Sequence, residues 1–98
     1  TLSWTTNAPS ASPKKITAQV EAPLPQGVTL NVQVDLSGKN SHGSGTGPQE
    51  LSTSPIDVVR GIYAEVVRDA PLKYEANVTA EADLSADIAR TVIYTIPD

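Results

Sequence analysis

The stretch VTLNVQVDL, residues 28–36, constrains the fold of this chain more than any other segment. Apolar residues stand at every second position from Val28 onward, and polar residues fill the positions between them. Because successive side chains of a strand point to opposite faces, this spacing gives one apolar face and one polar face. Such alternation is typical of antiparallel sheets with one buried and one solvated side. The segment is therefore predicted to be a half-buried strand.

Similar alternation recurs along the chain. It predicts strands over residues 1–6, 16–22, 72–82 and 90–96, and a short edge strand over 50–53. Pro and Gly separate these runs, as in APLPQG before Val28, because Pro cannot donate to a sheet and Gly adopts unusual dihedrals. Nearly the whole chain is thus assigned to strands and turns.

Residues 55–60 are predicted to form a single helical turn. Ser54 is a suitable N-cap, Pro55 suits the first helical position, and Asp57 supplies an acid in the first turn. Gly61 would end the helix, and residues 62–67 would continue as extended chain. A longer helix is also compatible with the spacing of the apolar residues Ile56, Val59, Tyr63 and Val66.

About seven strands at spacings of roughly ten residues indicate an all-β fold, an immunoglobulin-like antiparallel β-sandwich with Greek-key connections. The 98 residues suit one domain over 1–98. In this domain, residues 1–12 would form a terminal strand with a Pro- and Ser-rich spacer, and residues 13–98 the body of the sandwich.

The composition of the chain limits which cellular locations and binding partners are expected. The chain has no cysteine and a net charge of −4, and its seven Lys and Arg are scattered along the sequence, so nucleic acid is not expected as a partner. No apolar run approaches the roughly 20 residues that span a bilayer, so membrane insertion of the mature chain is not expected. A chain that starts at Thr1 suggests a processed protein, secreted to the cell surface or the medium after removal of a signal.

Catalytic residues are not identified in the sequence, and an enzyme is not expected. The one histidine, His42, lies in SGKNSHGSGTGP, a loop over residues 37–48 with four glycines and no apolar residue to anchor it. A general base needs a nucleophile and an orienting acid held rigidly, so a solvated loop histidine is the preferred interpretation. The glycines lack the Lys-Ser or Lys-Thr that follows them in phosphate-binding loops.

Two candidate sites lie near the end of the chain. Glu81, Asp83 and Asp87, with Asp69 nearby, could bind calcium through carboxylate oxygens, but without a regular ligand spacing solvated turn carboxylates are the preferred interpretation. No other cofactor is expected. Asn77 begins an Asn-Val-Thr triplet that fits the pattern for N-glycosylation.

The aromatic residues have two interpretations. Tyr63, Tyr74, Tyr94 and Trp4 could form a platform for a sugar, but Tyr74 and Tyr94 fall on apolar faces of predicted strands, where core packing is the stronger explanation. Trp4 lies in a short terminal segment on a Pro-rich tether. Leu2 and Trp4 would complete either their own domain or, as a donor strand, a second copy of it; the sequence leaves both open.

The Pro-Gly turn before the strand at 28–36, VVRGI, LKYEANVTAEAD and the final RTVIYTIPD together resemble secreted immunoglobulin-like β-sandwich modules of microbial surface proteins, similar to fimbrial or coat-type subunits. The resemblance covers residues 16–98. It implies a structural, non-enzymatic subunit of an extracellular filament, pilus or coat, whose partners are copies of itself joined by β-strand addition. The chain lacks the paired cysteines of many fimbrial subunits. The alternative is a glycan- or protein-binding module of a larger cell-surface protein, using loop 37–48 or Tyr63.

Overall fold

The computed structural model describes residues 1–78 and 91–97, and all regular structure in them is β. In chain order the strands are β1 (Leu2–Thr6), β2 (Lys14–Val20), β3 (Val28–Val34), β4 (Ser44–Gly45), β5 (Gln49–Glu50), β6 (Ile56–Ile62), β7 (Glu65–Ala70), β8 (Leu72–Val78) and β9 (Val92–Thr95). The predicted all-β class is confirmed. Within these residues there is no helix of the length and apolarity that crossing a membrane requires.

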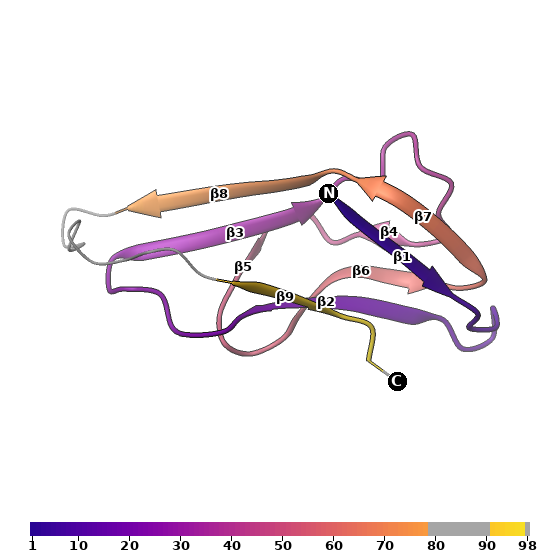
Figure 1. Cartoon of the computed structure of the whole chain (residues 1–98), viewed down its shortest axis with the longest axis horizontal. Helices are drawn as coiled ribbons and strands as arrows, with labels where there is room; N and C mark the ends of the chain where they lie inside the picture. The colour runs from indigo at the N-terminus through magenta and orange to yellow at the C-terminus, as the bar shows by residue number, and fades with distance from the viewer. Residues whose placement is uncertain (79–90, 98) are drawn as a thin grey trace.

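The strands form three antiparallel sheets with the orders β5-β3-β8, β4-β6-β2-β9 and β1-β7. In Figure 1, β3 and β8 lie along one side of the molecule and β2 and β9 along the other, while β1 and β7 lie toward the right-hand end. The segments 65–70 and 72–78 follow one another directly, yet the first pairs with β1 and the second with β3.

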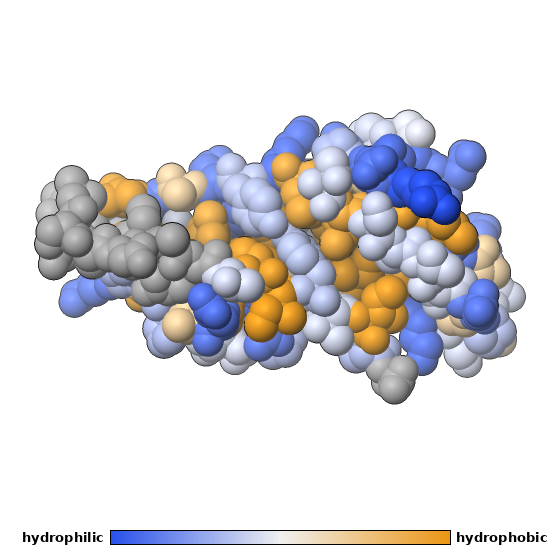
Figure 2. Space-filling model, in the orientation of Figure 1, coloured by the Kyte–Doolittle hydropathy of each residue, from blue (hydrophilic) through white to orange (hydrophobic). Residues whose placement is uncertain are grey.

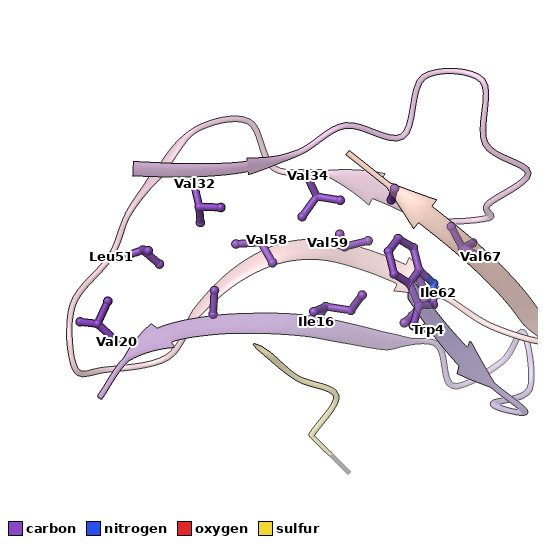
Figure 3. Close-up of a cluster of buried hydrophobic side chains, with 12 residues drawn as sticks. Trp4, Ile16, Val20, Val32, Val34, Leu51, Val58, Val59, Ile62 and Val67 are labelled. Carbon is purple, nitrogen blue, oxygen red and sulfur yellow. The ribbon is translucent and has the colours of Figure 1, made fainter. Parts of the chain in front are cut away.

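The core lies between the sheet that contains β3 and the sheet that contains β2 and β6. Figure 3 shows Val32 and Val34 of β3 pointing toward Ile16 and Val20 of β2, with the side chains of β6 between them. The described core is aliphatic except for Trp4, which packs at its β1–β7 end. The absence of Phe, Met and Cys from the sequence is therefore matched by a core of small branched residues that suit pleated sheets.

The strand predicted from the alternation over residues 28–36 is confirmed as β3, and its last two residues lie beyond the strand. Val28, Val32 and Val34 are buried, and Leu30 is partly buried. Strand β2, which lies in the sheet on the other side of the core, begins earlier than predicted, at Lys14, and also ends earlier, at Val20. The period of two predicted these strands because neither of them carries an extra residue: the β3–β8 ladder is unbroken, and the residues skipped in the β2–β6 ladder belong to β6.

The helical turn predicted over residues 55–60 is wrong, because these residues belong to β6. The pairing of β6 with β2 skips one residue at Val58 and another at Gly61, where the backbone has a positive φ of 80°. Each extra residue changes which side of the sheet the following side chains face. The apolar spacing along β6 therefore departs from two and imitates a helix.

The strand predicted over residues 72–82 is present as β8 up to Val78, and its remaining residues lie outside the described part. It is paired with β3 along its whole length but is far more exposed than predicted, with 48% of Tyr74 and 47% of Val78 accessible. Figure 2 shows hydrophobic residues exposed among polar residues on the face that it draws. Alternation identified the apolar face of β8, but burial also requires an opposing layer, and only Leu72, beside the core, is partly covered.

Loop 37–48 is anchored, contrary to the prediction, and it contains the short strand β4 that pairs with β6. A Cβ atom on Gly43 would lie 2.6 Å from Cγ2 of Ile62, and one on Gly45 would lie 2.8 Å from the carbonyl oxygen of Val34. Two of the loop glycines are thus needed for close packing against the core. This brings the residues that precede β4 against β7.

Candidate functional site: the first strand and its anchor

Strand β1 completes the core at one end of the molecule, and it does so within its own chain. It pairs antiparallel with β7, with Leu2 opposite Ala70 and Thr5 opposite Val66, and an irregularity interrupts the ladder between Leu2 and Trp4. Among the described residues β1 pairs with no other strand. Its other side borders a cavity of about 190 Å³, whose lining includes Ile16, Tyr94 and Ile96.

Trp4 fixes β1 to the rest of the fold. Only 6% of its surface is accessible, and its indole Nε1 donates a hydrogen bond of 2.9 Å to Oε2 of Glu65. A buried tryptophan gains apolar burial while it needs an acceptor for its single N–H group. Glu65, at the first position of β7, supplies that acceptor.

Glu65 is a buried carboxylate held by three donors, one from β1 and two from loop 37–48. Besides Trp4, it accepts a 2.6 Å hydrogen bond from Oγ of Ser41 and a 2.9 Å bond from the backbone N–H of His42, and 3% of its side chain is accessible. Burial pushes the pKa of Glu65 upward, but the hydrogen bonds from Ser41, Trp4 and the backbone outweigh it and hold the pKa below its ordinary value. The ionised carboxylate thereby ties β1, β7 and loop 37–48 together.

His42 lies on the solvent side of this anchor. Its ring stacks on Tyr63 with centroids 3.9 Å apart, and its Nδ1 lies 2.7 Å from the carbonyl oxygen of Tyr63 and 3.3 Å from Oε1 of Glu65. The Ser41 hydroxyl donates to Glu65 and accepts from the N–H of Gly43. The imidazole and the hydroxyl therefore each hold the loop in place, and they are not paired as base and nucleophile.

The spacer after β1 is also docked. Ala8 is buried, and its carbonyl oxygen accepts a 3.0 Å hydrogen bond from the N–H of Ala64, a residue with a positive φ of 41°. The N–H of Ser12 bonds to the carbonyl oxygen of Pro9 at 2.9 Å, which closes a turn before β2. The spacer that follows β1 is therefore held against the turn between β6 and β7.

The other predicted site residues do not join this cluster. Glu81, Asp83 and Asp87 lie outside the described residues. Within residues 1–78 and 91–97, no three acidic, histidine or cysteine side chains converge as a metal site would require. Asn77 is exposed on β8, where its Nδ2 donates to Oε1 of Glu75 at 3.3 Å.

The aromatic residues separate into different contacts instead of one platform. Tyr63 stacks with His42, Trp4 is buried, and the hydroxyls of Tyr74 and Tyr94 lie 2.5 Å apart. The prediction that Tyr74 and Tyr94 pack in the core holds in part for Tyr94, which packs against the core cluster, and is wrong for the largely exposed Tyr74.

Sequence reasoning missed Ser41 and Glu65. Neither residue belongs to a motif, and they are 24 residues apart. The available signal was indirect: a tryptophan expected in a core needs a hydrogen-bond acceptor, and Glu65 is an acid directly before the apolar pair Val66 and Val67 in a segment predicted to be extended.

Comparisons of the chain with protein-family models, with curated proteins and with solved structures found no match. The functional argument therefore rests on the geometry of β1 and its anchor.

Proposed function

We propose that this protein is a structural subunit of an extracellular filament, pilus or coat, and that copies join by exchanging β1. In this proposal the sheets form an immunoglobulin-like sandwich with Greek-key connections, to whose seven longer strands the two-residue strands β4 and β5 are additions. The observation that carries it is that the largest core side chain, Trp4, belongs to a terminal strand paired on one edge only among the described residues.

Exchange of β1 costs little because the same contacts form again. A β1 strand from a second copy would make the same ladder to β7 and the same hydrogen bond from Trp4 to Glu65 that the strand makes within one chain. The balance between the two arrangements then depends on the tether and on protein concentration. Since each copy gives one strand and receives one, the contact repeats head to tail and extends into an open chain.

Disulfide trapping tests the exchange, because the natural chain has no cysteine that would interfere. Thr5 and Val66 are opposite each other across β1 and β7, and both are exposed. Two proteins, one with Thr5→Cys and the other with Val66→Cys, are mixed, concentrated and oxidised. Strand exchange predicts disulfide-linked heterodimers between the two proteins, at the distance that opposed strand residues provide.

The matched control uses Gln33→Cys and Lys73→Cys, which are opposite each other in the ladder between β3 and β8. These strands lie inside the chain, so their mixture should give no specific heterodimer. Electron microscopy of concentrated wild-type protein should show filaments. The proposal fails if the Thr5 and Val66 variants cross-link no better than the control pair and only single particles are seen.

A further inference from the structure

A groove of about 700 Å³ lies over β2, β6 and the end of β9, on the outer side of their sheet. The alternation of β2 turns Ile16 and Ala18 into the core and presents Lys15 and Gln19 to the groove. Pro13, Pro55 and Pro97 stand among its lining residues, and no aromatic side chain does. This groove shares neither Trp4 nor Glu65 with the β1 anchor.

The irregular pairing of β6 brings charges together in this groove. Asp57 and Arg60 are three positions apart and would face opposite sides of a regular strand, but the extra residue at Val58 places both on the outer side, 2.9 Å apart from Nε to Oδ2. Lys14 and Lys15 are consecutive, and both line the groove at the place where the register with β6 shifts between them at Gly61.

The groove is positive in a chain whose net charge is −4. Three of the seven Lys and Arg of the sequence line it, Lys14, Lys15 and Arg60, and Asp57 is the one acid among its described lining residues. Asp57 binds Arg60 and, at 3.3 Å, Nζ of Lys15, and the hydrogen bond from Arg60 is the main cause that lowers the pKa of its carboxyl. Lys14 forms no ion pair with the described residues. The cations that look scattered in the sequence are thus gathered by the fold.

We infer that the groove binds a carboxylated polysaccharide. Lys and Arg side chains form strong charge-assisted hydrogen bonds with carboxylates, and Thr95 and Gln19 supply partners for sugar hydroxyls. Single-stranded nucleic acid is a poorer fit, because its bases stack on aromatic side chains and its phosphates would approach Asp57 closely. In a polymer with one carboxylate per sugar the negative charges are spaced apart, so they can pair with the three cations without lying against Asp57.

The test is calorimetric titration of the full chain with polygalacturonate at physiological salt, with neutral dextran as the negative control. Lys14→Gln combined with Arg60→Gln should weaken binding of polygalacturonate roughly tenfold or more, because two charged contacts are lost. The matched control combines Arg68→Gln with Lys73→Gln, which removes the same charge from exposed positions outside the groove. Its affinity should stay within about twofold of wild type, as expected for distant screened charges.

Asp57→Asn is expected to change the affinity in the opposite direction and strengthen binding severalfold, because it removes the one negative charge from the groove. Fluorescence of Trp4 checks that each variant is folded, and Lys15→Gln replaces the double variant if that protein does not fold. The inference is overturned if wild type does not bind polygalacturonate, if both double variants lose affinity equally, or if a single-stranded oligonucleotide binds the groove more tightly.

Discussion

The chain segment from Glu65 to Val78 forms two ladders that differ in kind. On one side of Pro71, β7 pairs with β1 through an interrupted register and buries Trp4 and Glu65. On the other side, β8 pairs with β3 in unbroken register from Leu72 to Val78, yet most of its side chains are exposed. The more regular ladder is therefore the less buried one. Pairing sets the register of a strand, whereas burial against a second layer supplies most of its stability.

This difference bears on which strand can be exchanged. Strand β8 is held by many small contacts along its ladder, and no single contact would allow a second copy to bind this strand in preference to another. Strand β1 instead carries its main contact on one side chain, Trp4, whose acceptor Glu65 is fixed in advance by Ser41 and the backbone of His42. A site prepared in this way selects the strand that presents an indole at the correct position.

The largest effect is expected for Trp4→Ala, compared with Tyr74→Ala in β8. Removal of the buried indole should reduce the free energy of unfolding by about 3–5 kcal/mol, since it leaves a cavity and takes one of three hydrogen-bond donors from the buried Glu65 carboxylate. Removal of the largely exposed Tyr74 should cost about 1 kcal/mol or less. Urea unfolding followed by circular dichroism measures both, because the first variant lacks the only tryptophan. Equal losses would show that the two ladders do not differ as described.

Much of the fold was predictable from local pattern, and the failures have identifiable causes. Strand β3 was predicted correctly because its alternation is unbroken and its inner face meets the opposite layer. Strand β6 was mistaken for a helical turn because Ser54, Pro55 and Asp57 match the start of a helix. Its apolar spacing did not correct this, because the extra residues at Val58 and Gly61 depend on the pairing with β2. The exposure of β8 was missed because alternation shows which face is apolar but not whether another layer covers it.

Only the β1 part of the candidate site was predictable from the sequence. The sequence identified Leu2 and Trp4 as a tethered apolar strand, but their contacts with β7 join residues more than 60 positions apart. Loop 37–48 was expected to lack an anchor because it has no large apolar residue, whereas it is held by close glycine packing and by Glu65. The basic groove could not be predicted from the sequence either, because Arg60 meets Lys14 and Lys15 only through the pairing of β6 with β2.

The second effect in size concerns Glu65, compared with the exposed Glu75 of β8. Glu65→Gln should lower the free energy of unfolding at neutral pH by about 1–3 kcal/mol, because an amide replaces an ionised acceptor of three hydrogen bonds. Glu75→Gln should change it by less than about 0.5 kcal/mol.

The pH dependence provides an independent readout. The pKa of Glu65 is lower in the folded chain than its ordinary value of 4.5, so its ionised form stabilises the fold above that value. This stabilisation should be lost as the pH falls from about 4.5 through the folded pKa, and the loss should be absent in Glu65→Gln. Thermal unfolding over this acidic range measures it. A wild-type curve parallel to that of Glu65→Gln would rule out the carboxylate as the anchor of β1.

The smallest effect is expected for Tyr74→Phe, which removes the hydrogen bond between the hydroxyls of Tyr74 in β8 and Tyr94 in β9. Burial is the main cause that raises the pKa of Tyr94 above its ordinary value, and the hydrogen bond with Tyr74, 2.5 Å between the hydroxyls, raises it further. The substitution should therefore lower the pKa of Tyr94 without returning it to that value, so that ionisation, followed by ultraviolet absorbance, begins at a lower pH.

The cost in unfolding free energy should be about 1 kcal/mol or less, as for other partly exposed hydrogen bonds. Tyr94→Phe serves as the spectroscopic control, because it removes the absorbance change assigned to Tyr94. A loss for Tyr74→Phe as large as that for Trp4→Ala would mean that β8, like β1, depends on a single side chain. The contrast between a strand anchored at one residue and a strand held along its whole ladder would then no longer support the proposal that β1 is the strand that exchanges.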